Sequence, residues 1–374
     1  MFFLILGSTA SIASALALSL LFFPSHTSNL LHATTSPTAK LSFTPTRLTP
    51  LDTATLILLV LLKYLLKLIG LHPPFHPSKP GNRDIALPPL ILSAPFQLNA
   101  SDLQKFTKAV QSTHPDDATS SPLLLAAATA PLLLVLLAHR ANPVLPFGAV
   151  NTGNRFEFRE PAACRAVRAL RAAQVTARVG GDELPGRRVK RGVEFAVVVE
   201  VTSHSQIVFR QVISILALLP KAALPLRETP QRSLHLESAT LSSSSAPPPA
   251  SEMLGKTWMG ELELAYGAPT AWAAVCKDVN PIHVSALAAT VFGFPGRVAH
   301  GNLVVARVVE MMREEGRGGV VWQMEKSWWM EVAFRRPVVL PVVLGVRLQG
   351  GEGEGAFEVL NGKKACVVGR YGVL

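Results

Sequence analysis

The chain has 374 residues, a mass of 40.1 kDa and a formal net charge of +11 at pH 7. This length leaves room for two domains and an extension. The charge alone permits nucleic acid, anionic lipid or a polyphosphate as partner. Nucleic acid is excluded because the sequence lacks a basic stripe with interleaved aromatic residues. The densest basic run, Arg187–Arg191, precedes an apolar strand pattern and predicts a solvated loop, with phosphate contact as the alternative.

The first 75 residues contain two apolar stretches. The stretch from Phe2 to Phe23 is uncharged, is long enough to span a bilayer and lacks the basic start of a secretory signal. It predicts a membrane anchor, with a cleaved targeting segment as the alternative. The second stretch, Ala54–Gly70, carries Lys63 and Lys67 on one helical face, which favours an interfacial amphipathic helix, or a partner to the first stretch, over a membrane span. We therefore expect a membrane location in an unspecified organelle.

A globular pattern begins near residue 100. The segment from Ser121 to His139 is apolar on all sides, yet Pro131 interrupts it and strand patterns follow closely. It therefore predicts a buried core helix rather than a third membrane span. The strands expected after it are Arg155–Arg159, Val193–Thr202 and Gln206–Leu218.

The run SSSSAPPP at residues 242–249 predicts an extended linker between two halves of similar size. The second half repeats the order of the first, with a helical pattern at Val298–Glu315 before four strand patterns. These strands are expected at Trp328–Arg335, Pro341–Gln349, Ala356–Leu360 and Lys364–Tyr371. The repeated order predicts a duplicated architecture. The expected regions are a membrane-anchor or targeting region with two apolar helices at 1–75, an N-terminal domain at 95–240, a linker at 241–252 and a C-terminal domain at 253–374.

One segment of the second half carries the chemistry. From Asp278 to Gly301 the chain reads D-V-N-P-I-H, five residues, A, three residues, G-F, four residues, A-H-G. The four residues D-V-N-P alone are a common turn opener. Together with His283 and with a second His and Gly at a helix start, they supply a carboxylate, an amide, an imidazole and a helix-terminal N–H. These groups are suited to adding water across an activated double bond.

This segment resembles the MaoC-like, (R)-specific enoyl-CoA hydratases, or hydratase 2 family. Every fixed position of the family's motif is matched, by Asp278, Asn280, Pro281, Ile282, His283, Ala289, Gly293, Phe294, His300 and Gly301. The resemblance implies an α+β double hotdog fold: two curled antiparallel sheets, each around a long central helix, here with an apolar helical N-terminal extension. It also implies that the N-terminal half is a degenerate hotdog that widens the acyl pocket.

The resemblance assigns the catalytic roles by position. Asp278 and His283 would activate one water, Asn280 would orient that water or the turn, and the Gly301 amide would stabilise charge on the thioester oxygen. The substrate-binding residues expected around them are Phe294, His300, Asn302, Arg297 and Arg335. A packing or surface role is the simpler alternative for Phe294 and the arginines, and a structural one for His300. No metal and no cofactor are expected.

Two positions depart from the family. Lys277 replaces a small residue, and Asn302 replaces a frequent methionine; neither change removes a catalytic group. The resemblance implies reversible hydration of trans-2-enoyl-CoA to (3R)-3-hydroxyacyl-CoA. The alternatives are 3-hydroxyacyl-[acyl-carrier-protein] dehydration, a catalytically silent membrane-anchored acyl-CoA binding protein and a thioesterase of the same fold. The expected partners are acyl-CoA or acyl carrier protein and a membrane, with a homodimer as one arrangement. The sequence ends in GVL, which does not support a peroxisomal address.

Overall fold

The structure, a computed structural model, describes residues 24–78, 84–113, 121–165, 170, 172–219, 257–317, 319–322, 325–350 and 353–374. The anchor expected at Phe2–Phe23 and the linker expected at 241–252 lie outside these residues. Within them, fourteen strands form one sheet. Its strands are β1 (Thr38–Lys40), β2 (His76–Pro77), β3 (Asp84–Ala86), β4 (Leu90–Phe96), β5 (Ala149–Phe158), β6 (Ala173–Val179), β7 (Gly186–Val189), β8 (Gly192–Ser203), β9 (Gln206–Leu218), β10 (Trp258–Leu264), β11 (Trp328–Phe334), β12 (Val342–Gly350), β13 (Glu354–Asn361) and β14 (Lys364–Val373).

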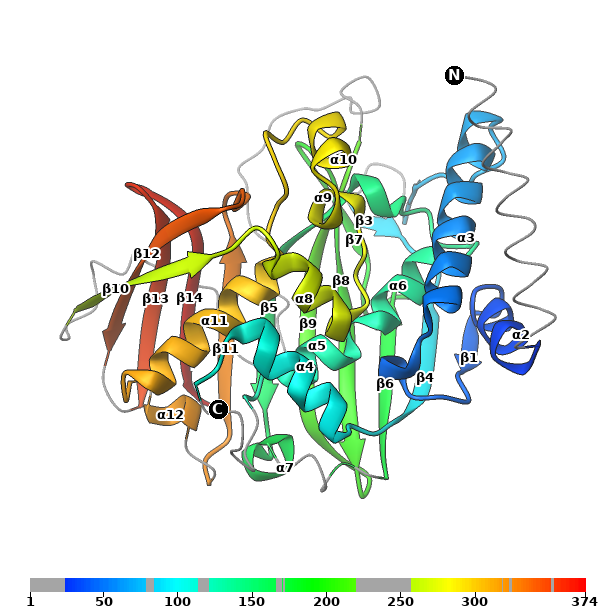
Figure 1. The fold of residues 1–374 in the computed structure, drawn as a ribbon. Helices are drawn as coiled ribbons and strands as arrows, with labels where there is room; N and C mark the ends of the chain where they lie inside the picture. Colours follow the sequence, from blue (N-terminus) through cyan, green and yellow to red (C-terminus); the bar gives the residue numbers. More distant parts are fainter. Residues whose placement is uncertain are drawn as a thin grey trace.

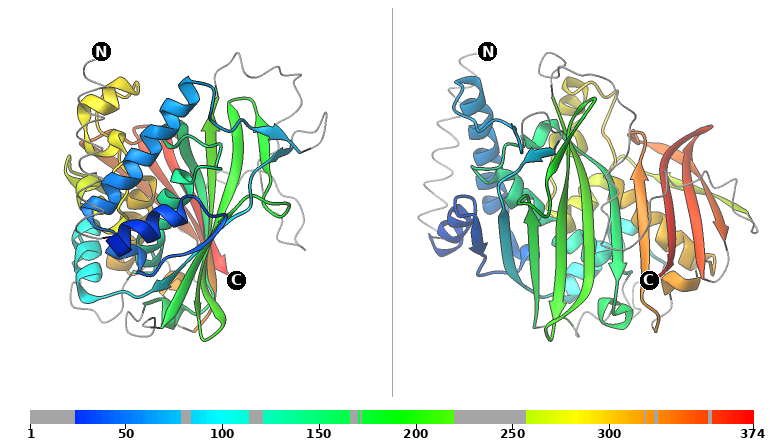
Figure 2. Two further views of the ribbon diagram at one scale, coloured as in Figure 1. Left: turned by 90° about the vertical axis from the view of Figure 1, so that its right-hand side faces the viewer. Right: turned by 180° about the vertical axis from the view of Figure 1, so that it is seen from behind.

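The α-helices lie mainly on one face of this sheet (Figure 1). They are α2 (Pro24–Ala33), α3 (Pro50–Leu68), α4 (Ala100–Val110), α5 (Leu124–Thr129), α6 (Pro131–Ala138), α7 (Pro161–Arg165), α8 (Ala268–Cys276), α9 (Pro281–Val284), α10 (Ala286–Val291), α11 (Gly301–Glu314) and α12 (Gly319–Trp322). The described residues also form short 3-10 turns at Pro45–Arg47 and Pro146–Gly148. Seen from behind, the described strands are not covered by these helices (Figure 2).

The strand order confirms the double hotdog. From the centre of the sheet outward, the N-terminal half runs β5, β9, β8, β6, β4, and the C-terminal half runs β11, β14, β13, β12, β10. In each half the main helices lie in sequence between the last strand of this run, β4 or β10, and the central strand, β5 or β11, while β1 extends the sheet beyond β4. The two halves join where β5 and β11 pair antiparallel, with Asn154 opposite Val332. One continuous sheet therefore carries both halves.

Alternating burial explains why these segments form strands. In β6, residues alternate between buried and more exposed, so one face packs on the helices. The seam between the halves is filled by aromatic side chains on that inner face. Trp328 of β11 stacks on Phe158 of β5 with ring centroids 4.1 Å apart, and both are fully buried. The core thus runs across the seam without a break.

The apolar segment from Ser121 to His139 is buried, as predicted, but forms two helices. Pro131 begins α6 at its first position, where a missing N–H costs no hydrogen bond. Leu124 and Leu132 are fully buried. The segment is therefore core, and the single long helix expected there is broken at the proline.

The expected role of Ala54–Gly70 as an apolar membrane segment is not supported. No helix within the described residues is long and apolar enough to cross a membrane. In α3, the Lys63 ammonium lies inside the protein and donates to the carbonyl oxygens of Leu137, His139 and Val144 at 2.7, 3.2 and 3.0 Å. Lys67, one turn later, is exposed. The helix packs on α6, so it is part of the N-terminal half.

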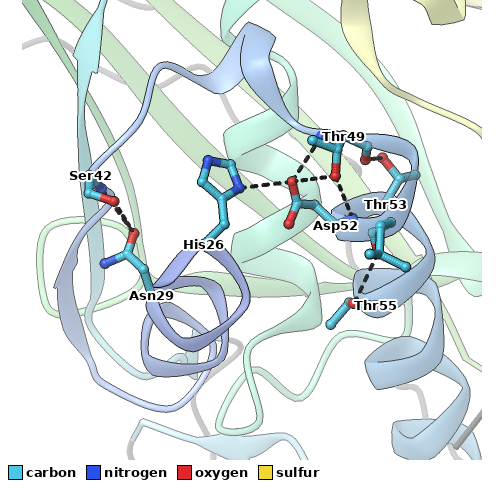
Figure 3. Close-up of polar contacts among 8 residues, drawn as sticks. His26, Asn29, Ser42, Thr49, Asp52, Thr53 and Thr55 are labelled. Carbon is cyan, nitrogen blue, oxygen red and sulfur yellow. Dashed lines mark hydrogen bonds and ion pairs between the residues drawn. The ribbon is translucent and has the colours of Figure 1, made fainter. Parts of the chain in front are cut away.

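Local capping fixes the start of α3 (Figure 3). The Asp52 N–H donates to Thr49 Oγ1 at 3.1 Å, while the Thr49 N–H donates to Asp52 Oδ2 at 2.9 Å, which is a capping box. His26 of α2 contacts the same carboxylate oxygen at 3.0 Å. Strand β1 then pairs parallel with β4, with Ala39 opposite Leu92. The described part of the extension is therefore integrated with the sheet.

Candidate active site

The motif residues form a tight turn between α8 and α9. Helix α8 ends at Cys276, and its C-cap residue, Lys277, has a left-handed backbone with φ of 55°. Asp278 Oδ1 then accepts from the Asn280 N–H at 3.0 Å, and Asn280 Oδ1 caps α9 by accepting from the Ile282 N–H at 3.4 Å. Asn280 therefore holds the turn. The Lys277 ammonium donates to the Ala274 carbonyl at 3.2 Å, so it caps α8.

His283 is held with one ring nitrogen free. Its Nδ1 lies 2.7 Å from the Val298 carbonyl oxygen. Because a carbonyl only accepts, Nδ1 carries the proton and Nε2 keeps its lone pair. His283 is therefore set up as a base through Nε2.

His300 lies directly against His283. The two rings stack with centroids 3.8 Å apart and an interplanar angle of 28°. The His300 Nε2–H donates to the Asp278 carbonyl oxygen at 3.2 Å and lies 3.6 Å from the carboxylate oxygen Oδ2. Burial, reinforced by His283, lowers the pKa of His300 to about 3. The ring is therefore neutral at physiological pH.

Asp278 is ionised beside these rings. Desolvation acts to raise the pKa of Asp278, but His300, His283 and the Asn280 N–H donor together hold it below its ordinary value. Its side chain is 46% exposed, so the carboxylate faces open space as well as the imidazoles. The site thus combines a carboxylate with two imidazoles, one of them presenting a free lone pair.

Helix α11 begins beside this cluster with its first N–H groups open. Its N-cap residue, His300, makes no side-chain capping bond. Four N–H groups at a helix start have no intrahelical partner, so they attract negative charge. Gly301 is required here, because an added Cβ would lie 2.6 Å from the Phe334 ring. Gly301 therefore lets the start of α11 lie close against the Phe334 ring.

The other predicted binding residues are spread around the turn. Arg297 is buried and braces the turn from behind: its Nε donates to the His283 carbonyl at 2.9 Å and its Nη2 to Thr270 Oγ1 at 2.7 Å. Arg335 is exposed after β11, and Phe294 is half-buried after α10. Arg297 thus positions the turn, whereas Arg335 is free to meet a ligand from outside.

Asn302 belongs to a chain of amides that sequence reasoning did not find. The Asn154 Nδ2 of β5 donates to Asn302 Oδ1 at 2.9 Å, and the Gln211 Nε2 of β9 donates to Asn154 Oδ1 at 3.0 Å. The signal at Asn154 is a polar residue in a strand whose buried side is otherwise aromatic. The partner lies 148 positions away, so no spacing rule connects the two.

Three ligand atoms, one each from Asp278, His283 and His300, lie within 4.8 Å of one another. That is close enough to surround a metal ion. The two imidazoles, however, are stacked, so their lone pairs do not converge on one point. The arrangement suits a shared water better than a metal.

Comparison with known proteins finds a recognised domain in the C-terminal half. Residues 269–368 match the family described as MaoC like domain. The 3-hydroxyacyl-thioester dehydratase X of Mycobacterium tuberculosis is 26% identical over 227 residues, which is 61% of this chain and 69% of that protein. The crystal structure of HtdX from the same organism is 20% identical, with a TM-score of 0.55, covering 76% of this chain and 100% of that one.

A MaoC-like dehydratase from Phytophthora capsici has the same fold, with a TM-score of 0.58 at 13% identity over 77% of this chain and 95% of that chain. The C-terminal half therefore contains a MaoC-like domain at residues 269–368, and the chain is similar to 3-hydroxyacyl-thioester dehydratase X.

Proposed function

We propose that the chain catalyses the reversible hydration of trans-2-enoyl-CoA to (3R)-3-hydroxyacyl-CoA. The match of residues 269–368 to the MaoC-like domain supports a hydro-lyase, and the relative from Mycobacterium tuberculosis is named for acting on 3-hydroxyacyl thioesters. The observation that carries the proposal is the pairing of Asp278 with the free Nε2 of His283 beside the open start of α11.

In this proposal one water bridges Asp278 and His283. Their ligand atoms lie within 4.8 Å of each other, and two hydrogen bonds of about 2.8 Å each span that distance through a single water. His283 Nε2 accepts a proton from the water as its oxygen bonds to C3 of the enoyl thioester. The ionised Asp278 accepts a hydrogen bond from the other O–H of the water, and its negative charge stabilises the imidazolium that forms on His283.

The electrons of the C2–C3 double bond move to the thioester oxygen, which becomes an enolate. The Gly301 N–H at the start of α11 stabilises this charge. When the enolate collapses, C2 takes the proton from His283. One water is thereby added across the double bond, and both protein groups return to their starting states.

The test uses the full chain, because α3 and β1 pack into the N-terminal half. Loss of the conjugated enoyl-thioester absorbance is followed with crotonyl-CoA and a longer trans-2-enoyl-CoA, and the product's configuration is determined. Asp278→Asn and His283→Ala are expected to abolish turnover while thermal unfolding stays close to that of the unmodified protein. The Lys277→Met variant, which changes only a capping group, is the matched control. Undiminished turnover in either folded active-site variant refutes the assigned roles.

The next experiment determines whether the acyl group of the substrate is carried by CoA or by acyl carrier protein. The same assay with a pantetheine thioester carried on acyl carrier protein separates the CoA hydratase from the carrier-protein dehydratase. Turnover of the carrier-bound substrate alone favours the dehydratase. A folded protein that is silent with both carriers favours acyl-CoA binding without catalysis.

A further inference from the structure

Two buried amides of the N-terminal half reach the catalytic helix of the C-terminal half. Asn154 and Gln211 lie on β5 and β9, with exposures of 2% and 1%. Gln211 stands opposite Phe156, and Asn154 is two residues from Phe156 on the same face, so the two amides are diagonal neighbours. The face they share is otherwise the apolar core side of the sheet.

Burying an amide side chain in such a position lowers the stability of the fold unless the amide is hydrogen-bonded. Replacing both partners of a buried hydrogen bond by apolar groups of similar shape is nearly neutral for stability, so packing alone does not require them. The chain they form has a direction. Gln211 donates to Asn154, Asn154 donates to Asn302, and each oxygen along the chain is an acceptor.

The direction of this chain of hydrogen bonds determines which side-chain atom Asn302 can present to a substrate. Its Oδ1 is engaged by Asn154, so its Nδ2 is the atom left to act as a donor. Asn302 is the second residue of α11, next to Gly301, and is only partly buried. Without the chain, the Asn302 amide is free to turn and to present an oxygen, which would repel an oxyanion.

We propose that Asn302 Nδ2 is a second donor to the thioester oxygen, and that Asn154 and Gln211 are positioning residues that fix its orientation. The inference rests on the proposed function and gives the N-terminal half a defined part in it. It assigns to that half a polar contribution to catalysis beyond shaping the acyl pocket.

The first test replaces donors by isosteric apolar groups in the full chain. With crotonyl-CoA as substrate, Asn302→Leu is expected to lower kcat about a hundredfold, as loss of one oxyanion donor does, with KM nearly unchanged. Gln211→Met should lower kcat less, because Asn154 then loses its orienting donor but keeps its place. The matched control is Gln349→Met: Gln349 is also a buried amide of the same sheet, and it bonds Thr257 instead.

The second test distinguishes orientation from mere packing. In Asn154→Asp, the protonated acid accepts from Gln211 and donates to Asn302, so the direction of the chain is kept. The ionised acid accepts from both neighbours and turns the Asn302 oxygen towards the substrate. The kcat of this variant should therefore fall as pH rises through the pKa of the introduced carboxyl group. The unmodified protein and Gln349→Met should lack this decrease.

Two results overturn the inference. One is an Asn302→Leu variant that keeps the unmodified kcat; the other is an Asn154→Asp profile that parallels the unmodified one. Either result, with an unmodified protein that hydrates crotonyl-CoA, leaves the proposed function standing. If the unmodified protein turns over no enoyl thioester on either carrier, the proposed function fails, and this inference fails with it.

Discussion

Lys63 offers the sharpest test of whether α3 is part of the fold. Its side chain is buried, and its ammonium donates to three carbonyl oxygens near the end of α6. Lys63→Met keeps most of the apolar stem but leaves those oxygens without a donor, at a cost of about 1–3 kcal/mol each. The variant also removes the cost of burying a charge. We therefore expect the free energy of unfolding to fall by about 3 kcal/mol.

The same residue predicts a pH dependence. Burial lowers the pKa of Lys63 from its ordinary value of 10.5 to about 7. Between these values the unfolded chain binds more protons than the folded chain, so this residue's contribution to stability rises with pH. The stability advantage of the unmodified protein over Lys63→Met should therefore grow from pH 7 towards pH 10, by at most about 1.4 kcal/mol per pH unit. The three carbonyl acceptors favour the ammonium form and reduce this slope.

The measurement is denaturant unfolding at several pH values, with Lys67→Met as control. Lys67 lies one turn further along α3 and is exposed, so its replacement should change the free energy of unfolding by less than about 0.5 kcal/mol. Equal stabilities of the two variants, or a difference that does not depend on pH, would refute the buried-ammonium reasoning.

Three further predictions concern the site. Gly301→Ala should lower kcat at least about tenfold, because the added Cβ meets the Phe334 ring. Adding Phe334→Leu should restore part of the activity. A double variant no more active than Gly301→Ala would contradict a clash with Phe334 as the cause. Burial holds the pKa of His300 at about 3, below its ordinary 6.5, so between these values the unfolded chain binds more protons and the free energy of unfolding should fall as pH drops. In His300→Asn the free energy of unfolding should depend less on pH in that window. An unchanged dependence would contradict the assignment. Arg297→Met should lower kcat, because it loosens the turn. Arg335→Met should raise KM for crotonyl-CoA but not for crotonyl-pantetheine, which lacks the CoA phosphates. Equal changes in KM for both substrates argue against a phosphate contact.

Local patterns were sufficient for the sheet and the turn. The strand expected at Gln206–Leu218 is β9 with the same bounds, because its alternation and its flanking polar residues are local signals. Ligand atoms of Asp278, His283 and His300 lie within 4.8 Å of one another, since a short motif brackets a turn and a helix start. These features require no knowledge of distant contacts.

The features that could not be predicted from the sequence depend on contacts between residues far apart in the chain. The sequence of α3 is the same whether its lysines face lipid headgroups or carbonyl oxygens, and the acceptors of Lys63 lie 74 to 81 positions away. The orientation of Arg297 towards Thr270 likewise depends on how α8 packs against the motif. Burial of a charged group can be predicted only once its partners are known, because an unpaired buried charge is too costly to occur.

The duplicated fold explains why a single site is expected. In the C-terminal half, the long helix α11 begins at Gly301, whose backbone N–H can donate to a ligand. In the N-terminal half, the corresponding helix α6 begins at Pro131, which has no N–H to donate. If Asn154 and Gln211 act as proposed, the N-terminal half takes part in catalysis across the β5–β11 seam. Separating the halves would then remove activity even if each folded, because Asn302 would lose the donor that orients it.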